Sequence, residues 1–453
     1  MVTPTSAWWA PSSKPPRYLV DMHLARRGYL LTVLTALLGI TGTWSDDPAL
    51  EGAWLLPAFL LLAGLAFEAW YLRGTQLSVR MQLDQRLKLG RVARGAYAFE
   101  HNRRLDLRLQ YARTLPEALR QLPEVRELSL PPGEELRDEF AVMPLRLGAA
   151  RFAAVPARLL GRLQLAWWSR ALPQDARFTI APDSVPRGVR PIAGESAGET
   201  PRRLPGVGVE LLQLRDYSSG DALSRIDWKA TARRGALVSR EYSEAQHLEI
   251  LIVVDASRAS RVRAGDLDRL GLYANVAARL AEHAVSVEDR VGVLVYAERA
   301  LRACLPDRGT RALVRLRHAL ETLETQRGEP DPLAAAVQVR RMLRHRGLVV
   351  WLTDLAEPAR NDALIQALKA LVPRHLPIVA APHAVEIERL AVAPAREWRD
   401  PSIAIAAREQ RQRALVQVGA LRQQGVVVLD EPDDQLDRAV FDAYLRLRSR
   451  KRV

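Results

Sequence analysis

Acidic and hydroxyl side chains follow two apolar runs in the second half of the sequence, and they are the residues best suited to hold a metal ion. The run 248–254 is followed by Asp255 and Ser257, and the run that begins at residue 348 is followed by Asp354. Both runs are typical of strands in an open α/β sheet, where ligands gather beyond the carboxyl ends of the strands. Two carboxylates and a hydroxyl placed there suit Mg²⁺, which takes oxygen ligands and keeps several waters.

A second unusual stretch, residues 214–234, interleaves acidic, basic and aromatic side chains. Its charged and turn-forming members are Arg215, Asp216, Gly220, Asp221, Arg225, Asp227, Lys229, Arg233 and Arg234. Around Tyr217 and Trp228, ion pairs between arginine and carboxylate would hold the segment rigidly against the next domain. The large apolar faces of the two aromatic rings favour burial, whereas the alternative is a solvated charge run.

The sequence lacks the spacings that mark most enzymes. No glycine precedes a lysine, which excludes a phosphate-binding P-loop, and no His-Glu-x-x-His string marks a zinc helix. A Gly-x-Ser-x-Gly string at 194–198 lies in the proline-rich passage 181–208, not at the strand-to-helix turn that a catalytic serine requires. A hydrolase that uses the three aspartates of 214–234 would lack a paired nucleophile and base. We therefore predict that the protein is not an enzyme.

The distribution of charge and the cysteine count exclude further classes of partner and site. The chain has 453 residues, 48% hydrophobic and 26% charged, and a net charge of +14. The basic residues are almost all arginine and are spread along the whole chain instead of gathering in one segment, so we predict no nucleic-acid partner. The lone Cys304 excludes an internal disulfide and a cysteine-cluster zinc site.

Two charge-free apolar stretches near the beginning of the chain, 28–45 and 52–67, predict a membrane hairpin. Both reach the lower limit of the length that spans a bilayer, and the second continues past Glu68 to residue 72. Basic residues flank the outer ends, at Lys14, Arg17, Arg26, Arg27, Arg73 and Arg80, whereas the short connection carries only Asp46, Asp47 and Glu51. The positive-inside rule then places both termini in the cytoplasm. The alternatives, a cleaved signal peptide or buried core helices, agree less well with two apolar runs in close succession.

The remaining chain divides by its hydrophobic period. Residues 76–180 show short alternating stretches, such as 105–109 and 125–130, which predict a small β-sandwich, although 116–122 could equally form a short helix. From 248 onward, apolar runs alternate with amphipathic windows, which predicts a parallel α/β sheet. The expected strands are 248–254, 291–296, 348–352, 378–381 and 426–429, and the expected helices are 266–285, 309–324, 331–345, 359–372, 402–424 and 434–449.

A family resemblance rests on the stretch 214–234. The residues that carry it are Arg215, Asp216, Tyr217, Gly220, Asp221, Arg225, Ile226, Asp227, Trp228, Lys229, Ala230, Ala232 and Arg233. They resemble the signature of the bacterial "domain of unknown function fifty-eight" family. The resemblance implies two N-terminal membrane helices, a β-rich segment, this signature box and a von Willebrand factor A-like domain. It also implies a MoxR-type AAA+ ATPase as partner and no established enzymatic activity.

The resemblance also points to a metal-ion-dependent adhesion site at Asp255, Ser257 and Asp354. Such a site has the pattern Asp-x-Ser-x-Ser with a threonine in a later loop, whereas Ala259 and Pro330 stand here where hydroxyls are expected. The site is thus degenerate, and we predict that the two carboxylates order their loops and that no cofactor is needed, with Mg²⁺ as the alternative.

Together these observations predict a multi-domain protein with a Rossmann-like α/β part. The expected segments are a cytoplasmic N-terminal segment (1–27), a transmembrane hairpin (28–72), a β-rich sandwich (73–180), a linker with the signature box (181–246), a von Willebrand factor A-like domain (247–430) and a basic C-terminal helix (431–453). We expect a scaffold in the bacterial inner membrane, with cytoplasmic domains, that works with the ATPase on an unidentified client complex. The alternative function is a metal-ion-dependent protein-binding module.

Overall fold

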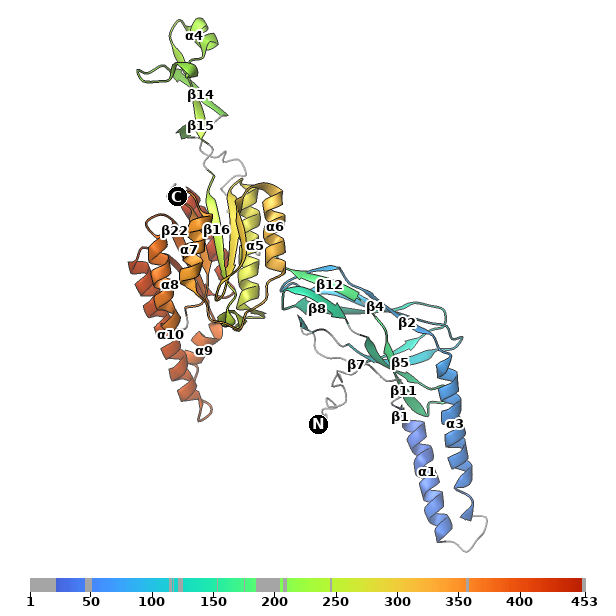
Figure 1. The fold of residues 1–453 in the computed structure, drawn as a ribbon. Helices are drawn as coiled ribbons and strands as arrows, with labels where there is room; N and C mark the ends of the chain where they lie inside the picture. The colour runs from blue at the N-terminus through green and yellow to red at the C-terminus, as the bar shows by residue number, and fades with distance from the viewer. Residues whose placement is uncertain are drawn as a thin grey trace. The chain divides into compact units, whose positions relative to one another are not determined.

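The structure is a computed structural model that describes residues 22–44, 51–113, 116, 118–120, 125–152, 154–174, 176–184, 204–206, 210–244, 247–355 and 358–449. The chain forms two units, Met1–Ala181 and Pro182–Val453. The string at 194–198, most of the linker 181–208 and the basic residues 450–452 lie outside the described residues. Figure 1 shows the elements in chain order.

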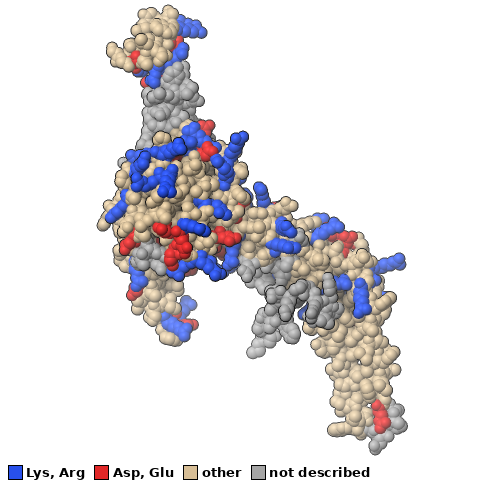
Figure 2. Space-filling view, in the orientation of Figure 1, with Lys and Arg blue, Asp and Glu red and all other residues tan. Residues whose placement is uncertain are grey.

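Two long helices, α1 (Arg26–Thr43) and α3 (Leu55–Arg73), lie near the beginning of the first unit and pack side by side (Figure 1). Their surface is largely uncharged in the view of Figure 2, and many of their large apolar side chains are exposed. Among the described residues, α3 is the one helix long and apolar enough to cross a membrane. The second span of the predicted hairpin thus corresponds to a helix that meets this criterion, and α1 pairs with it.

The β-rich part of the first unit consists of three sheets. A five-stranded sheet has the order β1-β11-β10-β5-β7, a four-stranded sheet the order β2-β4-β8-β6, and a three-stranded sheet the order β3-β12-β9. The strand bounds are β1 Met22–Leu24, β2 Leu77–Gln82, β3 Arg86–Lys88, β4 Ala93–His101, β5 Leu107–Ala112, β6 Leu119–Arg120, β7 Val125–Leu130, β8 Leu136–Pro144, β9 Gly148–Phe152, β10 Val155–Leu160, β11 Ala166–Leu172 and β12 Ala176–Ala181. Within 116–122, where a helix was the alternative, the structure describes the short strand β6.

Aromatic side chains from neighbouring sheets meet in the core of this unit. Tyr97 and Phe99 on β4 lie 5.7 and 4.9 Å, between ring centroids, from Tyr111 on β5. All three rings are buried. The hydroxyl of Tyr111 donates to the carboxylate of Asp138, which also accepts from Arg113 at 2.6 Å. Alternation along β4 and β5 therefore places large side chains inward. Asp138 and Arg113 satisfy the hydroxyl of Tyr111, whereas the buried hydroxyl of Tyr97 has no hydrogen-bond partner among the described residues.

Helix α3 is joined to the β-rich part by polar contacts at its C-terminal end. The carboxylate of Glu68 is fully buried and accepts from the backbone N–H groups of Leu165 and Ala166, at 3.0 and 3.1 Å. Arg170 donates to the carbonyl of Thr75 at 2.7 Å, and Arg103 donates to the hydroxyl of the same residue at 2.8 Å. The same two arginines donate to the carbonyls of Tyr71 and Leu72, which the end of the helix would otherwise leave without partners.

The second unit begins with a small antiparallel sheet that carries the signature box. Its order is β13-β15-β14, with the strands β13 Leu204–Gly206, β14 Glu210–Asp216 and β15 Val238–Glu244. The connection between β14 and β15 contains the 3-10 turn η2 (Leu223–Arg225) and the short helix α4 (Trp228–Arg234). We call this part, residues 210–244, the box lobe.

The remainder of the second unit is a six-stranded sheet with helices on both faces. The strand order is β20-β19-β16-β21-β22-β23, and all neighbouring strands are parallel except β19 and β20. The strands are β16 Glu249–Asp255, β19 Arg290–Tyr296, β20 Ala300–Asp307, β21 Leu348–Leu352, β22 Leu376–His383 and β23 Val427–Pro432. The helices are α5 Arg269–Ser286, α6 Gly309–Glu321, α7 Pro332–Met342, α8 Pro358–Leu371, α9 Val385–Val392, α10 Asp400–Gln423 and α11 Leu436–Ser449.

One face of this sheet is covered by α7, α8 and α10, whose apolar side chains form a single cluster with those of the strands. Helices α5 and α11 contact each other and the sheet on the other side (Figure 1). Because both faces are covered, the central strands are apolar along their whole length, as in β16 with Ile250, Leu251 and Ile252 fully buried. The carboxyl ends of the five parallel strands, β19, β16, β21, β22 and β23, lie at one edge of the sheet, where polar side chains converge.

Candidate functional site

The predicted ligand Asp255 ends β16 and is almost fully buried. Its Oδ1 accepts from the backbone N–H of Ser257 at 2.9 Å, and its Oδ2 accepts from the hydroxyl of Thr353 at 2.8 Å. Thr353 follows β21, which pairs with β16 in parallel, so the two ends lie next to each other. Burial raises the pKa of Asp255 above its ordinary value, against the hydrogen bonds with Ser257 and Thr353. Asp255 therefore orders the loop that follows β16 and the loop that follows β21.

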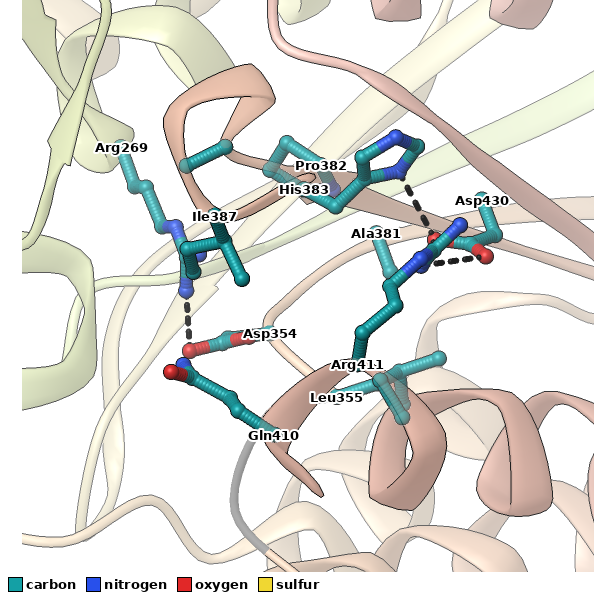
Figure 3. Close-up of a pocket in the computed structure, with 12 residues that line it drawn as sticks. Arg269, Asp354, Leu355, Ala381, Pro382, His383, Ile387, Gln410, Arg411 and Asp430 are labelled. Carbon is teal, nitrogen blue, oxygen red and sulfur yellow. Dashed lines mark hydrogen bonds and ion pairs between the residues drawn. The ribbon is translucent and has the colours of Figure 1, made fainter. Parts of the chain in front are cut away.

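The predicted ligand Asp354 pairs with a cation that the sequence analysis did not single out. Arg269, the first residue of α5, is only 3% exposed, and its guanidinium forms an ion pair with the carboxylate of Asp354 (Figure 3). Burial opposes the charged form, but the carboxylates of Asp354 and Asp433 hold the pKa of Arg269 above its ordinary value. The edge of the sheet thus contains a permanent positive charge.

Asp433, in the turn after β23, belongs to the same electrostatic group. Burial raises the pKa of Asp433 to about 6, and the charge of Arg269 opposes this rise. The Oδ1 atom of Asp433 is buried and has no hydrogen-bond partner among the described residues. A carboxyl group in such surroundings exchanges its proton near neutral pH, unlike an ordinary surface aspartate.

Next to Arg269, a pocket extends along the same edge between β22, β23 and α10 (Figure 3). His383 lies between two carboxylates, with Nδ1 at 3.0 Å from Asp430 and Nε2 at 3.1 Å from Glu388. Arg411 on α10 contacts the same pair, at 2.9 Å from Asp430 and 3.3 Å from Glu388. Asp354 and Arg269 line the pocket on its other side, so its wall carries both signs of charge.

The loops that hold Ala259 and Pro330 also meet at this edge. The N–H of Arg258 donates to the carbonyl of Gly328 at 3.2 Å, and the guanidinium of Arg258 lies 2.5 Å from Glu329. These are the two loops in which hydroxyl ligands of a complete metal site were expected. A half-exposed ion pair thus links the two loops from which these hydroxyls are missing.

The structure therefore brings Asp255, Ser257 and Asp354 to one edge, as the sequence predicted. Their surroundings contain Arg269, and among the described residues there is no group of three or more His, Cys, Asp or Glu side chains arranged to hold a metal. His383 was not predicted as a site residue. A usable signal was present, since His383 lies two residues after the expected strand 378–381, which places it at the ligand-binding edge.

In the box lobe, two aspartates organise the backbone. Asp227 precedes α4, and its Oδ1 accepts from the N–H groups of Lys229 and Ala230, both at 3.0 Å, while its Oδ2 accepts from Arg240 at 2.9 Å. The N–H of Ala230 and the charge of Arg240 hold the pKa of Asp227 below its usual range. This arrangement is a helix N-cap reinforced by an ion pair.

Asp221 plays the corresponding role in the preceding turn. It accepts from Arg215 at 2.6 Å and from the backbone N–H of Ser218 at 3.1 Å, and Arg215 lowers the pKa of Asp221. Gly220 lies between Ser218 and Asp221 and has φ +115°, a conformation that favours glycine. The ion pairs predicted for the box are thus present between Arg215 and Asp221, whereas Asp216 is exposed and has Arg234 at 3.5 Å.

The prediction that Trp228 is buried is wrong, because its side chain is 66% exposed. Leu223, in the turn before it, is 70% exposed. Trp228 is the first residue of α4, directly after the Asp227 cap that fixes the start of this helix. Three thin strands cannot cover an indole, so the lobe presents it on the surface.

Residues 213–391, from β14 to α9, match the model of a family described as "Protein of unknown function DUF58". Uncharacterized proteins of Mycobacterium bovis and Mycobacterium tuberculosis are each 26% identical over 174 residues, which is 38% of this chain and 54% of the relative. The chain thus matches about half the length of these curated relatives. The matched segment contains nearly all of the box lobe and, at the sheet edge, Asp255, Arg269, Asp354 and His383, whereas Arg411, Asp430 and Asp433 lie beyond it.

Two solved structures show weak similarity. The CARDB domain of a Pyrococcus furiosus protein, in complex with di-metal ions, has a TM-score of 0.17 and 12% identity over 24% of this chain and 96% of that domain. A β-glucosidase from Listeria innocua has a TM-score of 0.14 and 9% identity over 24% of this chain and 16% of the glucosidase. Scores this low carry no argument about this chain.

Proposed function

The chain belongs to the DUF58 family through residues 213–391, as its signature box predicted, and on this basis we propose that it is a membrane-anchored adaptor that binds other proteins and does not turn over a substrate. The observation that carries the proposal is the exposed indole of Trp228 on a rigidly braced lobe. The partner we propose, from the family resemblance, is a MoxR-type AAA+ ATPase that acts with the adaptor on a client complex.

The box lobe has the properties of a protein-binding surface. Tryptophan and arginine are among the side chains that most often dominate binding energy at interfaces. Trp228 and Leu223 are both about two-thirds exposed, and Arg233 and Arg234 follow on α4. Because Asp221 and Asp227 already fix the backbone, little conformational entropy is lost when a partner binds.

The same contacts argue against a catalytic role for the box aspartates. Asp221 and Asp227 each accept hydrogen bonds from an arginine and from backbone N–H groups, and these bonds depress their pKa values. A carboxylate held in this way is a weak general base at neutral pH. The hydrogen-bond geometry instead supports a structural role for both residues.

Anchoring is proposed from the first unit. Helix α3 is long and apolar enough to cross a bilayer, and its partner α1 exposes apolar side chains along much of its length. Arginines at the outer ends of both helices, Arg26 and Arg73, favour the cytoplasmic side for these ends. We propose that the hairpin lies in the bacterial inner membrane and that the sheets and the box lobe are cytoplasmic.

The test compares two exposed tryptophans in the full chain purified in detergent. Trp228→Ala should weaken binding to the MoxR-type ATPase from the same genome by about tenfold or more, with an unchanged melting temperature. Trp398, 83% exposed and outside the family match, provides the control, since Trp398→Ala should leave binding intact. Equal binding by the Trp228→Ala variant and the natural chain would overturn the proposed surface.

A further inference from the structure

Arg269 occupies an unusual position for a basic residue. It is the first residue of α5, where the helix dipole disfavours positive charge, and its side chain is only 4% exposed. The helix does not need it for capping, because Asp268 accepts from the N–H of Gly271 at 2.8 Å. A buried guanidinium in such a place is stable only if carboxylates surround it.

Those carboxylates are the acidic residues at the edge of the sheet. Asp354 forms an ion pair with Arg269, and Asp433 is coupled to it electrostatically. Asp255, in turn, is coupled to Asp354, and both of its carboxylate oxygens already accept hydrogen bonds from within the chain. Every acidic residue predicted as a ligand is therefore engaged by the protein itself.

From this arrangement we infer that the guanidinium of Arg269 is a built-in cation that takes the place of a divalent metal ion at the carboxyl edge of the sheet. A cation entering between Asp255 and Asp354 would meet a fixed positive charge in a buried site of low polarity, where like charges repel strongly. The loops of Ala259 and Pro330, whose positions 259 and 330 lack the expected hydroxyls, are linked by a half-exposed ion pair between Arg258 and Glu329. Any ligand that binds at this edge of the sheet therefore binds without a divalent metal ion. This does not depend on which partner the box lobe binds.

The experiment measures thermal unfolding of the full chain in detergent, with EDTA or with millimolar Mg²⁺ or Mn²⁺. The natural chain should melt at the same temperature in all three buffers. Arg269→Gln removes the charge and should melt lower in EDTA. It should then recover by about 3 °C or more with either metal, because the freed carboxylates accept the ion.

Arg279→Gln is the matched control. Arg279 is another buried arginine on α5, paired with Asp183 at 3.2 Å and with Asp437, and its replacement should lower the melting temperature without any recovery by metal. Arg269→Lys keeps a positive charge, so it should fold without metal and show no response to it. This variant keeps the inference testable if Arg269→Gln does not fold.

Three results would overturn the inference. The first is a rise in the melting temperature of the natural chain with Mg²⁺. The second is a metal response of Arg269→Gln no larger than that of Arg279→Gln. The third is a metal response of Arg269→Lys equal to that of Arg269→Gln, which would show that the charge at this position does not exclude the metal.

Discussion

The buried carboxylate of Glu68 predicts a large and local effect of mutation. Glu68 lies near the C-terminal end of α3, is fully buried, and accepts from the N–H groups of Leu165 and Ala166 and from the indole N–H of Trp168 at 3.4 Å. Glu68→Ala would leave two backbone donors buried at the start of β11 without an acceptor. We expect this variant to loosen the junction between the helix and the β-rich part.

The magnitude follows from the bonds that are lost. Each hydrogen bond to a charged group contributes about 1.5–3 kcal/mol, and each buried donor left without a partner costs about 1–3 kcal/mol. Two well-formed bonds therefore predict a loss of about 3–5 kcal/mol in the free energy of unfolding of the first unit. Glu68→Gln keeps one acceptor and should lose about half as much. Gly161→Ala tests the same contact from the other side, since a Cβ there would lie 2.0 Å from the Glu68 side chain.

The assay is chemical unfolding in detergent micelles, followed by tryptophan fluorescence, together with limited proteolysis near residue 165. Glu100→Ala serves as the control, because Glu100 is an exposed glutamate on β4 of the same unit and should change the stability by less than about 0.5 kcal/mol. If Glu68→Ala and Glu100→Ala unfold at the same denaturant concentration, the carboxylate does not hold the helix and this reasoning is refuted.

Three further predictions concern other parts of the chain. Asp138→Ala should destabilise the first unit by about 3–5 kcal/mol in the same unfolding assay, because it leaves Arg113 charged and buried without this partner; a loss below about 1 kcal/mol would contradict this. Burial raises the pKa of Asp433 from 3.8 to about 6, so the folded protein binds a proton that the unfolded chain has released, and stability falls as pH rises from about 4 to 6. Asp433→Asn should remove this fall in melting temperature, and an identical pH profile for both proteins would argue against it. A reporter fused after Val453 should be active only in the cytoplasm, and periplasmic activity would reverse the proposed orientation.

The α/β part is where sequence patterns and structure agree best. The expected strand 248–254 corresponds to β16, the expected strand 348–352 to β21, and the expected helix 309–324 to α6. Buried parallel strands are continuous apolar runs, which stand out against amphipathic helices. The edge strand β20 escaped prediction because it lies antiparallel at the border of the sheet and contains only exposed and half-buried residues, without a regular alternation. Helix α9 escaped because it is only eight residues long.

The candidate site was predictable only in part, and the reason is physical. Asp255 and Asp354 directly follow apolar strands, so their position at the sheet edge can be inferred from local sequence. Arg269 starts a helix 14 residues after Asp255, in a chain where arginine occurs everywhere, so its type and spacing carry no signal. The burial of Trp228 was predicted from ring size alone, but a lobe of three strands has too little surface to cover an indole.

The junction at the end of α3 has a mechanical consequence. Only residues 74–76 separate α3 from β2, and Arg103 and Arg170 bind the carbonyl and hydroxyl groups of this short turn. A flexible linker would let the sheets rotate freely relative to the helix, whereas this short, hydrogen-bonded connection prevents that rotation. If α3 spans the bilayer as proposed, the helix and the sheets of the first unit move as one rigid body. A change in membrane thickness that tilts the helix would then rotate those sheets through the same angle. The protein could in this way convert a change in bilayer thickness into a change in the orientation of the sheets of its first unit.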